Sequence, residues 1–154
     1  MPIQANIMAP DFTLPDENGT PRTLSSFRGK PVVLYFYPKD DTTGCTTEAC
    51  SFRDDYSIYQ EAGIVVLGVS PDSVQSHTKF KNKYNLPFTL LADDGHKVCE
   101  LYEAWGRKKF MGREYDGVFR ITFLIGPDGT IIKVFENVKP VGHSAQVFAA
   151  LQKS

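Results

Sequence analysis

The chain has 154 residues, and at about 150 residues per domain this length predicts one domain, residues 1–154. Seventeen Lys and Arg against eighteen Asp and Glu leave a net charge of −1, so there is no basic excess to bind a nucleic acid or an anionic membrane surface. With 42% hydrophobic and 23% charged residues, the composition is that of a globular protein and excludes a disordered or fibrous one.

The apolar segments are short, and the cysteines are few. The longest apolar runs, Pro31–Tyr37 and Ile64–Val69, fall far short of the roughly 18 residues that a transmembrane helix needs. The first ten residues lack the basic and long apolar regions of a secretory signal, so we expect a cytoplasmic location. Three cysteines are an odd number and too few for a disulfide scaffold, which indicates thiol chemistry or simple burial.

The N-terminal part of the chain predicts a hairpin followed by a buried strand. Asp11–Leu14 alternates in polarity, as a first strand would, and Asn18-Gly19 is a strong turn pair. Arg22–Leu24 is then expected to form the second strand of the hairpin. Ser25–Gly29 is typical of one helical turn ended by glycine. The β-branched and aromatic run Pro31–Tyr37 predicts a central strand that is covered on both faces.

The middle of the chain alternates helices and strands. After the polar loop 38–44, we expect a helix from about Cys45 to Ala62 and a second buried strand over Ile64–Val69. A further helix over Ser73–Tyr84 and a short strand over Phe88–Leu91 continue the alternation.

The C-terminal third completes the predicted fold. We expect a helical segment over His96–Trp105, then a loop, then a hairpin formed by Val118–Ile125 and Ile131–Asn137. His143–Lys153 predicts a final helix. The pattern indicates an α/β, thioredoxin-like fold in which helices flank a central mixed β-sheet and a β-hairpin precedes it.

Cys45 stands where chemistry is expected. It lies between the loop that follows a buried strand and the first turn of a helix, where open α/β sheets tend to place ligands, and a helix N-terminus favours the thiolate. The hydroxyls of Thr42 and Thr43 can cap the helix or bind an oxygen-containing substrate. Pro38 has no N–H to donate and can shield the pocket from water. The alternative is that Cys45 is a small residue that only packs in the core.

Residues 38–45, Pro-Lys-Asp-Asp-Thr-Thr-Gly-Cys, resemble the P-x-x-x-T-x-x-C signature of the peroxiredoxins. The continuation Thr46–Cys50 resembles the peroxiredoxin Q (bacterioferritin comigratory protein) subgroup, which has a second cysteine five residues after the first. The resemblance extends over almost the whole chain, through the segments Ala9–Phe12, Leu67–Ser70, Leu90–Asp93 and Arg120–Ile125. Thr43 departs from the proline usual in the subgroup, and Gly126 departs from an acidic residue.

The resemblance implies an antioxidant, thiol-dependent peroxidase that reduces hydrogen peroxide and small organic hydroperoxides without cofactor or metal. Cys45 would be the peroxidatic cysteine, which becomes a sulfenic acid, and Cys50 would resolve it as an intramolecular disulfide. Arg120 would lie beside Cys45 and stabilise the charge on sulfur and on the peroxide oxygens. Thr42 would hydrogen-bond the substrate and Pro38 would shield the sulfenic acid. Thioredoxin or a similar dithiol would recycle the enzyme, and a monomer would suffice.

The spacing of the two cysteines predicts a conformational change. A five-residue step along an ideal helix separates the Cα atoms by roughly 8 to 9 Å, whereas a disulfide needs them within about 7 Å. If Cys45 and Cys50 bond during turnover, the helix must unwind between Thr42 and about Phe52.

Several alternatives stay open at this point. Cys99 is expected in the core, with a free or resolving thiol as the alternative, and Cys50 can also be read as a buried helix residue. Arg120 can be read as a solvated charge at a strand end. The histidines show no ligand spacing with the cysteines, so no metal site is predicted: His77, His96 and His143.

Two rival functions also remain. A thiol-disulfide oxidoreductase on the same fold favours a Cys-x-x-Cys pair, which the sequence lacks. A non-catalytic redox sensor or metal-handling module would show stoichiometric oxidation without turnover. The basic residues of one predicted loop can form a solvated face or dock an acidic electron donor: Arg107, Lys108, Lys109 and Arg113.

Overall fold

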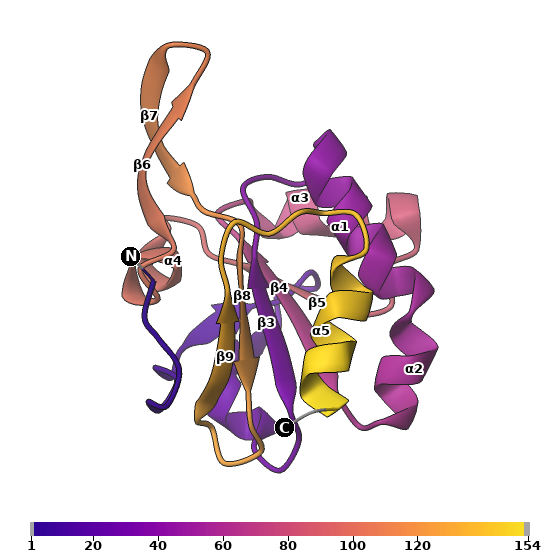
Figure 1. The fold of residues 1–154 in the computed structure, drawn as a ribbon. Helices are drawn as coiled ribbons and strands as arrows, with labels where there is room; N and C mark the ends of the chain where they lie inside the picture. Colours follow the sequence, from indigo (N-terminus) through magenta and orange to yellow (C-terminus); the bar gives the residue numbers. More distant parts are fainter. Residues whose placement is uncertain (1, 153–154) are drawn as a thin grey trace.

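A five-stranded mixed sheet forms the centre of the computed structural model, which describes residues 2–152 (Figure 1). The strands lie in the order β5-β4-β3-β8-β9, with bounds Thr89–Ala92, Val65–Ser70, Val32–Phe36, Ile121–Ile125 and Ile131–Phe135. β3, β4 and β5 are parallel, whereas β8 is antiparallel to β3 and to β9. Every residue of β3 is buried, so the predicted central strand with two covered faces is confirmed.

Helices and the N-terminal segment cover the two faces of this sheet. On one face, the helices α1 (Thr43–Asp54), α2 (Tyr56–Glu61), α3 (Val74–Tyr84) and α5 (His143–Gln152) pack in one apolar cluster. The other face is covered by α4 (Lys97–Leu101) and by apolar residues of the N-terminal segment. The α/β, thioredoxin-like fold with its central mixed sheet is confirmed. None of the helices in residues 2–152 combines the length and apolar character needed to cross a bilayer.

The predicted N-terminal hairpin is present. β1 (Thr13–Pro15) and β2 (Pro21–Thr23) pair antiparallel as a separate two-stranded sheet, and Gly19 in the turn has a φ of +79°, which glycine adopts readily. The helical turn that follows is a 3-10 helix over Leu24–Phe27.

The helix predicted over residues 45–62 is two helices. α1 begins at Thr43, two residues earlier than expected, and ends at Asp54, and α2 begins at Tyr56 after the intervening Asp55. The Asp55 carboxylate accepts a hydrogen bond from the Ser144 hydroxyl (2.6 Å), and the Tyr59 hydroxyl donates to the Ser144 carbonyl (2.6 Å). The break therefore depends on contacts with α5, which local sequence cannot reveal.

α3 and α5 agree more closely with expectation. Ser73 precedes α3 and its hydroxyl oxygen accepts the Ser76 N–H (3.1 Å), while Asn85 ends the helix in the left-handed conformation. α5 begins at His143 as predicted, and the predicted end at Lys153 lies outside the described residues.

The region between α4 and β8 is where the prediction was wrong. α4 ends at Leu101, and the expected loop is a hairpin of β6 (Trp105–Phe110) and β7 (Arg113–Val118). The hairpin projects from the body of the molecule (Figure 1), so burial does not impose an alternating pattern on its sequence. Consequently β8 begins at Ile121 instead of Val118, and β9 ends at Phe135.

Candidate active site

Cys45 lies in the first turn of α1 and is almost completely buried, with 1% of its surface exposed. The preceding Gly44 lies close to Arg120, since a Cβ atom at Gly44 would stand 3.1 Å from the guanidinium Nη2. A larger residue at position 44 would push this cation away from the thiol.

Sheet register brings Arg120 to the thiol. Ile121 of β8 pairs with Phe36 of β3, so Arg120 stands beside the end of β3 from which the chain leads to Cys45. Its Nη2 donates a hydrogen bond to the Cys45 Sγ at 3.3 Å, and its side chain is 18% exposed. A guanidinium is permanently charged, so this contact favours the thiolate. The alternative of a solvated strand-end charge is wrong.

Glu48 holds the other end of the guanidinium. It lies one helical turn after Cys45, is fully buried, and its Oε1 accepts from Arg120 Nη1 at 2.7 Å. Burial raises the pKa of Glu48 to about 7, although the charge and hydrogen bond of Arg120 oppose this effect. Within residues 2–152, Glu48 Oε2 has no hydrogen-bond partner. The guanidinium is therefore fixed between a sulfur and a carboxyl group.

His143 lies behind Glu48. Its Nδ1 contacts the amide oxygen of Gln146 (3.0 Å) and its Nε2 contacts the Thr122 hydroxyl (2.8 Å), which suits a neutral ring protonated at Nδ1. Burial lowers the pKa of His143, and Arg120 adds to this while the Gln146 hydrogen bond opposes it. The 4.0 Å approach of Nε2 to Glu48 Oε2 is therefore a contact with a neutral imidazole.

Thr42 occupies the position before α1, with an extended backbone at φ −94° and ψ 157°. Its carbonyl accepts the Thr46 N–H (2.8 Å), and its hydroxyl donates to the Lys39 carbonyl (2.9 Å). In the described part of the chain the hydroxyl makes no helix-capping hydrogen bond, so the capping role is wrong. Its oxygen lone pairs can still accept a hydrogen bond from a substrate. Pro38 is half-buried at the start of the same loop.

All three cysteines are free thiols. Cys50 is half-buried on α1, and burial raises the pKa of its thiol, with Arg53 opposing and Asp54 adding to the shift. Cys99 is fully buried, in the apolar cluster on the opposite face of the sheet from Cys45. Burial and the nearby Asp93 carboxylate raise the pKa of Cys99, so the predicted core position is confirmed.

A hollow of about 380 Å³ opens beside Arg120. It is lined by Pro2, Lys108, Phe119, Arg120, Ile121, Glu136 and Asn137. Burial lowers the pKa of Lys108, and the Arg120 charge adds to this effect while Cys45 opposes it. The hollow, which combines cationic and apolar side chains, can accommodate a small molecule larger than hydrogen peroxide.

Comparisons with known proteins show the family of the chain. The AhpC/TSA family model matches residues 6–134. The chain is 49% identical over 152 residues to peroxiredoxin Bcp of Bacillus subtilis, covering 99% of this chain and 97% of that protein. It is 46% identical over 142 residues to peroxiredoxin Bcp of Escherichia coli, covering 92% and 91%. The chain belongs to the peroxiredoxins.

Structural similarity supports the same family. A structure of bacterioferritin comigratory protein from Xanthomonas campestris, described with its alkyl peroxide reduction activity, matches this peroxiredoxin with a TM-score of 0.90. The two chains are 37% identical, and the match covers 97% of this chain and 98% of that one. This peroxiredoxin is a thiol-dependent peroxidase of the Bcp, or peroxiredoxin Q, subgroup, and the family uses a hydroperoxide substrate and a thiol reductant.

Sequence reasoning missed two residues beside the site of this peroxiredoxin. Glu48 could have been found, because a carboxyl group one turn after the nucleophile shares its helix face. His143 carries no such signal, since it is 98 residues from Cys45 along the chain and only the packing of α5 against α1 brings it near. Glu48 contacts Arg120 directly, and His143 lies 4.0 Å from Glu48.

Proposed function

We propose that this peroxiredoxin reduces hydrogen peroxide and small organic hydroperoxides with Cys45 as the peroxidatic cysteine and Cys50 as the resolving cysteine. The observation that carries the proposal is the hydrogen bond from Arg120 Nη2 to Cys45 Sγ, 3.3 Å, at the N-terminus of α1. A permanent cation and a helix N-terminus both favour the thiolate that must attack the peroxide.

In the first step, the Cys45 thiolate attacks one oxygen of the hydroperoxide. The S–O bond forms as the O–O bond breaks, and the departing oxygen takes a proton and leaves as water or an alcohol. Arg120 stabilises the charge that develops on the oxygens. The Thr42 hydroxyl, which already donates to the Lys39 carbonyl, accepts a hydrogen bond from the hydroperoxide O–H, whose proton stays on the oxygen that becomes the sulfenic acid, and Pro38 shields the sulfenic acid from water.

In the second step, the Cys50 thiol attacks the sulfenic Sγ of Cys45, the S–S bond forms and water leaves. The first turns of α1 must unwind for this step because both cysteines stand five residues apart on one helix. Burial raises the pKa of the Cys50 thiol in the folded helix. Unwinding removes that burial and so makes Cys50 a better nucleophile when it is needed.

An external dithiol then reduces the disulfide, and we propose thioredoxin as this donor. Because both thiols are on one chain, we propose that the enzyme acts as a monomer, as one domain of residues 1–154, in the cytoplasm. The hollow beside Arg120 supports the inclusion of organic hydroperoxides among the substrates. No nucleic acid or membrane partner enters the cycle.

The test is peroxide consumption with thioredoxin, thioredoxin reductase and NADPH, comparing the native chain with Cys45→Ser, Cys50→Ser and the matched control Cys99→Ser. We expect Cys45→Ser to abolish turnover and Cys99→Ser to leave it unchanged. Cys50→Ser should be oxidised once, with a sulfenic acid that dimedone traps, and should not turn over with thioredoxin.

Native turnover by Cys50→Ser would contradict the resolving role and would assign resolution to Cys99 or to an external thiol. Stoichiometric oxidation of the native chain without turnover would favour the redox-sensor alternative instead.

A further inference from the structure

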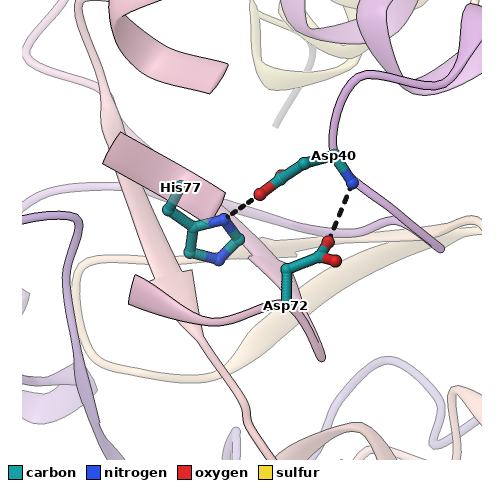
Figure 2. Close-up of side chains that lie close together, drawn as sticks. All are labelled: Asp40, Asp72 and His77. Atoms are coloured by element: carbon teal, nitrogen blue, oxygen red, sulfur yellow. Dashed lines mark hydrogen bonds and ion pairs between the residues drawn. The ribbon is translucent and has the colours of Figure 1, made fainter. Parts of the chain in front are cut away.

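Asp40, Asp72 and His77 form a cluster outside the site described above, in which Asp40 and His77 are buried and Asp72 is half-buried (Figure 2). Asp40 belongs to the loop 38–42 between β3 and α1, Asp72 follows β4, and His77 lies in the first turn of α3. His77 is fully buried and Asp40 is 7% exposed. The peroxidase cycle proposed above does not use these three side chains.

The hydrogen bonds of His77 define its charge. Its Nε2 lies 2.8 Å from the Leu91 carbonyl oxygen, which can only accept, and its Nδ1 lies 2.6 Å from Asp40 Oδ2. Asp40 also accepts the Tyr37 hydroxyl at Oδ1 (2.6 Å) and the Ser76 hydroxyl at Oδ2 (2.8 Å), as an ionised carboxylate does. Both ring nitrogens therefore donate, and His77 is an imidazolium paired with a carboxylate.

The same three side chains could in principle hold a metal ion, because their ligand atoms lie within 4.8 Å of one another. A metal would have to replace the proton on His77 Nδ1 and compete with the hydrogen bonds already made. Asp72 Oδ2 accepts the Asp40 backbone N–H (2.8 Å) and the Ser70 hydroxyl (2.6 Å). The geometry favours an ion pair in which the acceptors are already occupied.

This ion pair ties the loop to another part of the molecule. The Asp40 side chain bonds to His77 of α3, and the Asp40 backbone N–H donates to Asp72, so the loop is attached both to α3 and to the segment that follows β4 (Figure 2). The same loop carries Pro38 and Thr42, and it ends at the N-terminus of α1. Removing one partner of a buried pair leaves an uncompensated charge, which is far costlier than losing a surface pair.

We propose that His77, as a buried imidazolium, is a positioning residue that holds the loop 38–42, and with it Thr42 and the N-terminus of α1, in place for reaction at Cys45. The inference rests on the proposed function, since it concerns the rate of the same step.

The surroundings of His77 predict the direction of a pH effect. Burial lowers the pKa of His77. The hydrogen bond and charge of Asp40, the hydrogen bond to the Leu91 carbonyl and the charge of Asp72 together raise it by more, so the net shift is upward. The titratable groups that face the ring are Asp40, Asp72 and Tyr37. A raised pKa means that the ion pair is fully present below about 6.5 and is lost as the pH rises through the higher folded value. We therefore expect the His77–Asp40 ion pair to hold the loop 38–42 in place at neutral pH and to be lost at alkaline pH, where His77 loses its charge.

The first measurement is the ¹⁵N spectrum of protein labelled in histidine. We expect both ring nitrogens of His77 to remain protonated at pH 7, and the half-buried His96, which lies outside the cluster, provides a second histidine resonance for comparison. A His77 ring with one protonated nitrogen at pH 7 overturns the proposal. A change in the His77 resonances when Zn²⁺ or Mn²⁺ is added to metal-free protein also overturns it, in favour of a metal site.

The second measurement is the rate constant for oxidation of Cys45 by hydrogen peroxide, with sulfenic acid trapped at timed intervals. We expect His77→Asn to slow this step by about 10- to 100-fold, because the displaced loop misplaces the reacting groups. The alkaline decline of the native pH profile should be absent from His77→Asn. The matched control is His96→Asn, which removes a half-buried histidine outside the cluster, at a left-handed position that asparagine tolerates, and it should react at the native rate.

A double variant separates positioning from general damage. Asp40→Asn alone leaves the imidazolium unpaired, whereas Asp40→Asn combined with His77→Asn leaves no unpaired charge and should recover part of the lost rate. A native rate in His77→Asn overturns the proposal. If His77→Asn does not fold, two measurements still test the proposal: the ¹⁵N spectrum of the native protein, and the rate of Asp40→Asn, which should also be lower than the native rate. Failure of the proposed function is distinct, because then peroxide does not oxidise Cys45 in the native chain.

Discussion

The loop 38–42 adjoins the first turns of α1, which contain Cys45, but different contacts hold the two segments. In the loop, Asp40 bonds to Ser76 and His77, and Asp41 bonds to Lys83 and Tyr84, so both aspartates reach α3. This segment is therefore held by side-chain contacts between residues far apart in the sequence.

In the first turns of α1, Cys45 and Glu48 bond to Arg120, and two further side-chain hydrogen bonds are local. The Thr47 hydroxyl donates to the Thr43 carbonyl (2.9 Å), and the Ser51 hydroxyl donates to the Glu48 carbonyl (2.7 Å). A turn held by local bonds can open without disturbing the rest of the fold. The segment proposed to bind substrate is therefore anchored to α3 by side-chain hydrogen bonds, whereas the segment proposed to unwind is held by its own helix, by Arg120 and by apolar packing of Cys45 and Ala49.

The largest expected effect comes from breaking the attachment at Arg120. Lysine in Arg120→Lys has a single ammonium group and cannot donate to Cys45 Sγ and Glu48 Oε1 in the same fork geometry. We expect the rate constant of Cys45 with hydrogen peroxide to fall by about 100-fold, as measured by stopped-flow single turnover. A native rate in this variant would show that positive charge alone is sufficient.

A smaller effect concerns the buried carboxyl group of Glu48. Its pKa is about 7 in the folded protein against an ordinary value of 4.5, so folding favours the protonated form. This stabilisation is present below about pH 4.5 and is lost as the pH rises through about 7, because the buried carboxyl must then ionise. Glu48→Gln keeps an oxygen for Arg120 but cannot ionise.

We therefore expect the free energy of unfolding of Glu48→Gln, relative to the native protein, to rise between pH 5 and 8 by on the order of 3 kcal/mol. Urea titrations at several pH values measure this difference, and the contribution of His77 cancels because both proteins contain it. A difference that does not change with pH would mean that Glu48 has an ordinary pKa.

The next prediction tests the boundary between the two segments directly. When the Cys45–Cys50 disulfide forms, we expect the backbone amides of residues 43–50 to exchange hydrogen about tenfold faster or more, while residues 39–42 keep their protection. Phe52 limits the unwinding, because it is fully buried and stacks on Tyr35 at 5.0 Å between ring centroids. Mass spectrometry of exchange in the reduced and oxidised forms makes the comparison, and equal exchange over 43–50 would rule out the unwinding.

The smallest effect is expected at Thr43, the first residue of α1. Proline is favoured at this position, and the preceding Thr42 already has the extended backbone that proline requires of its neighbour. Thr43→Pro should stabilise the reduced protein by about 0.5 kcal/mol by restricting the unfolded chain. Thermal unfolding measures this change, and Thr47→Ala, in the same helix turn, serves as a control that removes a local bond instead. Destabilisation by Thr43→Pro would show that the turn before Cys45 must remain flexible.

Elements with a strong local signal could be predicted from the sequence. The run that forms β3 is apolar throughout because both its faces are covered, and α3 is bounded by Ser73 and Asn85, whose side-chain chemistry suits helix ends. Elements whose bounds depend on contacts with distant parts of the chain could not be predicted from the sequence. The division between α1 and α2 at Asp55 needs Ser144 of α5, and the β6–β7 hairpin lacks a buried face that would impose alternation.

For the candidate active site, the sequence by itself predicted Cys45 as the nucleophile and determined where it lies in the fold. Cys45 follows a buried strand and begins a helix, and this order along the chain is enough to expect a reactive thiol, because the helix terminus acts over a few neighbouring residues. The five-residue step to Cys50 likewise requires unwinding on helix geometry alone. Only the tertiary structure decided which charges meet that thiol and its loop. Arg120 reaches Cys45 through the antiparallel register of β3 and β8, and His77 reaches Asp40 by the packing of α3. Such contacts join residues distant in sequence, and burial gives them their strength.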